Sequence, residues 1–167
     1  QLKPDDARAQ ALLGGVYDDM GKFDQAQAAL DKALERESDP GQRKKLAEQI
    51  AMVLAKKAYN AGRLAGADKE SSQILALNPD NFVAHFFLGL IDAQHGKTDE
   101  AERQYQEVLR IVPGHALARL NLAAIHEQNG HEEDAVDEYK AVMISGVPGL
   151  ADTARGRLEQ LMKRIGG

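Results

Sequence analysis

The stretch "GKTDEAERQYQEVLRIVP", from Gly96 to Pro113, has the composition of a charged helix between a glycine and a proline. A related stretch, "GHEEDAVDEYKAVM", begins at Gly130, and its glycine, alanine and tyrosine fall 34 residues after those of the first stretch. A fixed period of this length is typical of repeat proteins, in which each copy is one small unit that buries its apolar face only against its neighbours.

The same pattern occurs four times along the chain. Four glycines are each followed five residues later by an alanine, in the pairs Gly21–Ala26, Gly62–Ala67, Gly96–Ala101 and Gly130–Ala135. Eight residues before each glycine stands a leucine followed by a small residue, in the pairs Leu13–Gly14, Leu54–Ala55, Leu88–Gly89 and Leu122–Ala123. Further residues follow each alanine at offsets of four and three, as in Ala101, Tyr105 and Val108, and these offsets place the side chains on one helix face. Each unit is therefore predicted to be a helix, a glycine turn and a second helix, with small residues where the two backbones approach closely.

This pattern resembles the tetratricopeptide repeat family, whose 34-residue helical hairpin carries W-x2-L-G-x2-Y, then A-x3-F, then P. The residues that carry the resemblance are Leu13, Gly14 and Tyr17 in the first unit and Leu88, Gly89, Ala101, Tyr105 and Pro113 in the third. The tryptophan position departs from the family pattern and holds Gln10, Ala51, His85 and Arg119. The resemblance implies an all-α, right-handed α-solenoid of four helix-turn-helix repeats plus a C-terminal capping helix.

We expect one array over residues 1–167, with repeats at about 7–40, 48–81, 82–115 and 116–149 and the capping helix at 150–165. Residues 1–6 resemble the end of a unit and are expected to be the remnant of a preceding repeat. Seven residues are inserted before the second unit, because its glycine follows the first after 41 residues instead of 34. Asp39 is a good N-cap and Pro40 suits the first helical position, which predicts one long helix from about Pro40 to Ala61.

Composition limits the possible partners. The net charge of −5 argues against nucleic acid, which requires a basic face. No apolar run approaches the roughly 20 residues of a membrane span, so no direct membrane insertion is expected. The chain has no cysteine, which excludes disulfides and thiolate–zinc sites and leaves cytoplasmic and extracytoplasmic compartments equally open.

The search for chemistry predicts no enzyme, no cofactor and no metal site. No metalloprotease, phosphate-loop or nucleophile-elbow motif occurs. Of the five histidines, His126 and His131 straddle the Gly130 turn beside Glu132 and Glu133. A weak metal-assisted site there is the least favoured of the functional hypotheses, since turn polarity and helix packing explain the same residues.

The run "FVAHFFLGLI", Phe82 to Ile91, is apolar nearly all round, whereas a helix with one solvated face is not. The family resemblance implies that first helices line the concave side of the array at unit positions two, five, six and nine. The predicted partner-binding groove consists of Met52, Lys56, Val83, Phe86, Phe87, Leu90, Leu117, Leu120 and Asn121. We expect a non-catalytic scaffold that docks a helical or extended segment of another protein there. The alternative is an assembly module whose apolar surface binds a second copy or packs against further repeats.

One partner class is disfavoured by the same positions. Chaperone-binding members of the family hold a peptide carboxylate with lysine, arginine and asparagine at the concave positions of three consecutive units. Here the first frame supplies Ala11, Gly15, Val53, Val83 and Phe87, and the frame one unit later supplies Met52, Lys56, Phe87, Leu117 and Asn121. Neither frame forms a cationic clamp, so an acidic chaperone tail is not the expected ligand.

Overall fold

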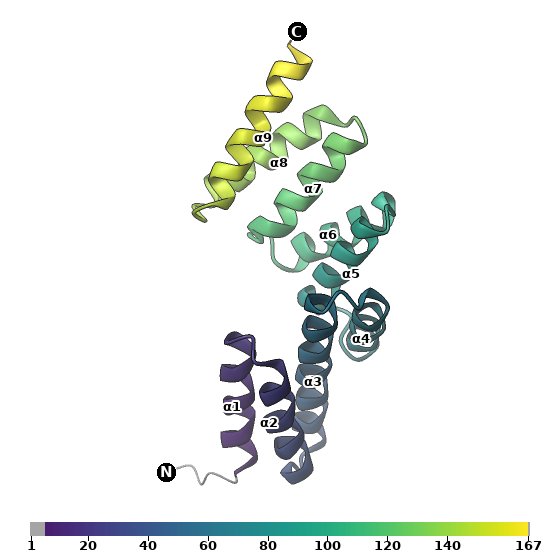
Figure 1. The fold of residues 1–167 in the computed structure, drawn as a ribbon, viewed down its shortest axis with the longest axis vertical. Helices are drawn as coiled ribbons and strands as arrows, with labels where there is room; N and C mark the ends of the chain where they lie inside the picture. The colour runs from purple at the N-terminus through teal and green to yellow at the C-terminus, as the bar shows by residue number, and fades with distance from the viewer. Residues whose placement is uncertain (1–5, 167) are drawn as a thin grey trace. The chain divides into compact units, whose positions relative to one another are not determined.

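The computed structural model describes residues 6–166, and within that range the chain forms nine α-helices and no strand. Successive helices are joined by short turns (Figure 1). Their bounds are α1 Ala7–Asp19, α2 Phe23–Arg36, α3 Pro40–Asn60, α4 Leu64–Leu77, α5 Phe82–Gln94, α6 Thr98–Ile111, α7 Ala116–Gln128, α8 Glu132–Ile144 and α9 Leu150–Ile165. The predicted all-α class is confirmed. The expected remnant at residues 1–6 lies, except for Asp6, outside the described residues.

The four repeat glycines lie in the turn between the two helices of each pair, where the backbone adopts a positive φ. Gly96 and Gly130 adopt φ of 73° and 78°, a left-handed conformation that costs other residues energy. The residue after each glycine closes the turn: the amide of Lys97 donates to the Asp92 carbonyl at 2.9 Å. The amide of His131 likewise donates to the His126 carbonyl at 2.8 Å. In each turn this hydrogen bond therefore holds together two residues that are five positions apart in the sequence.

The chain divides into two compact units, Gln1–Ile91 and Asp92–Gly167. In the first unit α1 packs on α2, α2 on α3, and α3 on α4. One cluster of buried side chains joins α2 to α3 and consists of Ala26, Leu30, Ala33, Leu46 and Val53. Gly14 of α1 is buried over Leu30, which confirms that a small residue is needed where these two helices approach.

The predicted long helix is α3, which begins at Pro40 and ends at Asn60, one residue before the expected end. The Asp39 side chain accepts a hydrogen bond from the Gln42 amide at 2.7 Å, so the predicted N-cap is confirmed. Near this end of α3, Arg43 donates from Nη1 to the carbonyls of Leu34 and Glu37 at 2.6 and 2.7 Å. The inserted turns of α3 thereby satisfy carbonyls at the C-terminal end of α2.

In the second unit α6 packs on α7, and α7, α8 and α9 pack on one another (Figure 1). Their shared core consists of Ala123, Ala135, Tyr139, Val142, Ala154 and Leu161. The apolar stripe of α9 packs on the α7–α8 pair through Ala154 and Leu161. No helix among residues 6–166 combines the length and apolarity that crossing a membrane requires.

Candidate functional site

The apolar run on α5 is only partly covered by its own unit. Val83, Phe86, Phe87 and Leu90 are all half-buried, whereas the opposite face of α5 is buried. The Phe87 ring stands edge-on to Tyr59 of α3, with ring centroids 5.4 Å apart and planes at 65°. The ring centroids of Phe86 and Phe87 are 6.4 Å apart, and these two rings also meet edge-on. These geometries are favourable aromatic contacts, so part of the predicted aromatic surface already packs within the chain.

The two predicted groove residues of α3 have intramolecular partners. Met52 is half-buried and packs against a small core cluster that includes Ile74. The Lys56 ammonium lies 2.5 Å from Oδ2 of Asp18 on α1. Both side chains of this ion pair are largely shielded from solvent, at 28% and 16% exposure. Lys56 therefore neutralises a partly buried carboxylate, and a partner that used its charge would have to compete with Asp18.

The predicted groove residues of α7 differ in accessibility. Leu117 is 39% exposed. Leu120 is half-buried against the core around Tyr139. Nδ2 of Asn121 donates to the Tyr105 hydroxyl at 3.3 Å, which orients the amide. Leu117 is thus the more accessible of the two leucines, and Asn121 is held in place by α6.

Among the described residues of the first unit, the most exposed apolar surface lies on α1 and was not predicted from the sequence. On α1, Leu12, Val16 and Met20 are 58%, 54% and 56% exposed, and Leu13 beside them is 39% exposed. Their offset of four is a visible signal, because it places Leu12, Val16 and Met20 on one helix face. Its significance was hidden because only Leu12 occupies a concave position of the repeat. We call these four residues the α1 apolar face.

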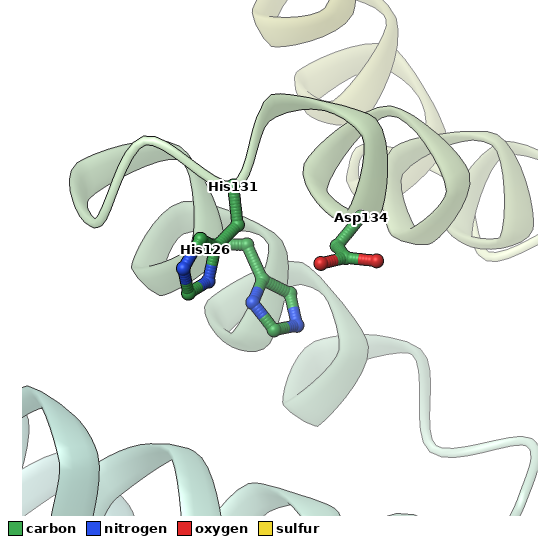
Figure 2. A group of neighbouring side chains, drawn as sticks. All are labelled: His126, His131 and Asp134. Atoms are coloured by element: carbon green, nitrogen blue, oxygen red, sulfur yellow. The ribbon is translucent and has the colours of Figure 1, made fainter.

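A second group was only partly anticipated. One ligand atom each from His126, His131 and Asp134 lies within 4.8 Å of the others. Figure 2 shows the two imidazole rings side by side and the Asp134 carboxylate directed toward His126. The acidic member is Asp134 and not Glu132 or Glu133 as the sequence suggested, and Glu132 lies 3.6 Å from Arg164 instead. The offset of three between His131 and Asp134 in the first turn of α8 is the signal that identifies it.

A buried tyrosine beside this region shows a strong electrostatic effect without any catalytic geometry. The Tyr139 hydroxyl donates to Oε2 of Glu127 at 2.8 Å, and Glu127 also pairs with Arg164 at 3.3 Å. Burial and the neighbouring Glu127 carboxylate raise the pKa of Tyr139 to about 12. The phenol is therefore a stable hydrogen-bond donor that connects α8 to α7.

Comparisons with solved structures identify the fold. MamA is 21% identical over 86% of this chain and 80% of its own, with a TM-score of 0.60. YrrB, a TPR protein with an unusual peptide-binding site, is 23% identical over 90% and 74%, with a TM-score of 0.59. PcrH, in complex with the chaperone binding region of PopD, is 20% identical over 69% and 90%, with a TM-score of 0.65.

The sequence comparisons agree with the structural ones at the level of the family. No curated protein sequence matches this chain. The family model described as the protein kinase G tetratricopeptide repeat matches residues 1–162, which is nearly the whole chain. The chain therefore belongs to the protein kinase G tetratricopeptide repeat family.

Proposed function

We propose that this protein is a non-catalytic scaffold that docks a helical or extended segment of another protein. The segment would bind to a mainly apolar surface on the first helices of the repeats. The observation that carries the proposal is the state of α5, whose residues Val83, Phe86, Phe87 and Leu90 remain half-buried although the helix is apolar nearly all round. Two structural relatives are described as binding a peptide or a protein segment, YrrB and PcrH. The contacts proposed are Met52, Lys56, Val83, Phe86, Phe87 and Leu90 in the first unit and Leu117, Leu120 and Asn121 in the second.

The aromatic pair supplies the driving force in this proposal. A fully buried phenylalanine removes roughly 150–250 Å² from water, at ~25 cal/mol per Å². Because Tyr59 already covers part of Phe87, the gain is smaller than two fully exposed rings would give. The cost of association reduces it further, so the proposed complex is a weak one, of roughly micromolar affinity.

The test is selection of peptides on the wild-type protein from a display library of random 15-residue peptides, followed by titration of the selected peptide. Phe86→Ser with Leu120→Ser should weaken binding at least about tenfold, since each removes an apolar anchor. The control is Ile144→Ser, which changes a side chain that is 85% exposed and outside the proposed contacts. Far-UV circular dichroism establishes that all three proteins are folded. Equal affinities for the double variant and the control would refute the proposal.

The alternative function is assembly, and the α1 apolar face favours it. Four neighbouring large apolar side chains on one exposed helix are more than scattered surface residues. In this alternative α1 packs against a second copy or against further repeats. Light scattering discriminates: a mass that rises with concentration above the 18.2 kDa of one chain supports self-association. Leu12→Ser with Val16→Ser should then restore the mass of one chain, and a constant mass for the wild type would contradict self-association.

A further inference from the structure

The turn between α7 and α8 contains a polar arrangement that packing does not explain. His126 is buried, with 9% of its surface exposed, and its Nδ1 has no hydrogen-bond partner. A buried polar atom without a partner costs about 1–3 kcal/mol, so such an atom in a folded protein requires an explanation. A bound group that contacts Nδ1 of His126 would supply such an explanation.

The preceding turn of the same unit shows one way in which these two positions can be filled. Asp92 and Lys97 stand 34 residues before His126 and His131, and they form an ion pair at 3.7 Å. In both turns the backbone of the second residue donates to the carbonyl of the first, at 2.9 and 2.8 Å. The backbone therefore brings two side chains together in each turn. In the turn between α7 and α8 these are the imidazoles of His126 and His131, with ring centroids 6.0 Å apart.

His131 does not cap its helix, in contrast to His115 of the same unit. His115 caps α7, because its Nδ1 accepts a hydrogen bond from the Ala118 amide at 3.1 Å. His131 stands at the same position before α8, yet its side chain makes no capping hydrogen bond. Its ring lies instead beside His126, with Asp134 completing the group (Figure 2).

We propose that His126, His131 and Asp134 bind a divalent transition-metal ion, with Zn²⁺ as the best fit. Imidazole nitrogen and carboxylate oxygen are ligands of Zn²⁺, with bonds of about 2.0–2.2 Å. Such bonds around one ion require ligand atoms roughly 3.3 Å apart. The three ligand atoms lie within 4.8 Å of one another, and His131 and Asp134 are exposed, so rotation of these two side chains closes the remaining gap.

The electrostatic environment supports a cation. Of the three carboxylates in the first turn of α8, Glu132 pairs with Arg164, and Glu133 and Asp134 are left to attract a cation. Their charge outweighs the partial positive charge of the helix N-terminus, which is about half an elementary charge. Mg²⁺ and Ca²⁺ prefer sites made of oxygen ligands only, so two imidazoles select against them. The bound ion would join the end of α7 to the start of α8 and stabilise this helical hairpin.

The experiment is isothermal titration of the untagged 167-residue chain with Zn²⁺, and with Mg²⁺ for comparison. We expect one Zn²⁺ per chain and no Mg²⁺ binding at the same concentrations. At 100 times the dissociation constant, Zn²⁺ should raise the thermal midpoint by at least about 3 °C, because the ion binds the folded state. Absorption of the Co²⁺-loaded chain in the visible range reports a low coordination number directly.

Matched variants assign the ion to these residues. His131→Asn and Asp134→Asn change exposed side chains, so both variants should fold, and each should weaken Zn²⁺ binding more than about tenfold. His95→Asn changes an exposed histidine of the preceding turn and should leave the affinity unchanged. No Zn²⁺ binding at millimolar concentration would overturn the proposal. Equal binding by the wild type and His131→Asn would overturn it as well.

Discussion

Two adjacent glycines of α1, Gly14 and Gly15, have opposite surroundings. A Cβ added at Gly14 would lie 2.6 Å from Cγ of Leu30 and 3.3 Å from the Ala26 carbonyl oxygen. Leu30 is 2% exposed and belongs to the buried cluster that joins α2 to α3. A Cβ at Gly15 would meet nothing within 4 Å. The first glycine is thus required by the approach of α2, and the second is a residue of low helix propensity on an exposed surface.

The pair gives a prediction in which the same substitution has opposite signs. Gly14→Ala should lower the free energy of unfolding by about 1–3 kcal/mol, because an added methyl group in a packed contact forces its neighbours to move. Gly15→Ala should raise it by up to about 1 kcal/mol, because alanine favours the helix over glycine. Urea denaturation of both variants and the wild type measures the two changes. Changes of the same sign would show that helix propensity, and not the contact with Leu30, decides the outcome at Gly14.

Helix ends show how far the sequence could predict individual elements. The aspartate–proline pair that begins α3 was predicted because Asp39 is a residue type that commonly caps helices. The capping role of His115 was not predicted, because histidine is not a preferred cap and only the structure shows its Nδ1 near the Ala118 amide. The repeat pattern likewise identified the faces of α5 but not the contact between Phe87 and Tyr59, because periodicity does not specify which distant side chain covers a ring. Asp134 was missed because three consecutive acidic residues follow His131, although Asp134 alone stands at the offset of three that places it beside that histidine.

The cap on α7 predicts a dependence of stability on pH. Burial lowers the pKa of His115 below its usual 6.5, since the charged form is poorly solvated. Above pH 6.5 neither the folded nor the unfolded chain protonates this residue. As the pH falls below 6.5, the unfolded chain gains a proton that the folded chain resists, so the free energy of unfolding decreases until the lowered pKa is reached.

His115→Asn should remove this dependence while it preserves the cap, because asparagine is among the best N-cap residues. The measurement is the free energy of unfolding of wild type and variant between pH 8 and pH 5. The difference between the two proteins should be constant above pH 7 and should shift in favour of the variant below pH 6.5. A difference that stays constant over the whole range would contradict the role given to His115.

At the scale of the whole molecule, a repeat array is stabilised by contacts between neighbours, so damage at one end should stay local. In the second unit the last element, α9, contributes Ala154 and Leu161 to the core shared with α7 and α8, and both residues are 0% exposed. The loss of α9 should therefore expose the α7–α8 pair first.

Leu161→Ala tests this expectation, because truncation of a buried leucine costs about 2–5 kcal/mol. Hydrogen exchange followed by mass spectrometry should show faster exchange over α7, α8 and α9 and unchanged exchange over α1 and α2. Met162→Ala is the matched control, because Met162 adjoins Leu161 on the same helix but is 51% exposed, and it should leave every segment unchanged. Faster exchange spread evenly from α1 to α9 would mean that the chain unfolds as a single cooperative body, which nearest-neighbour stabilisation does not allow at this magnitude of perturbation.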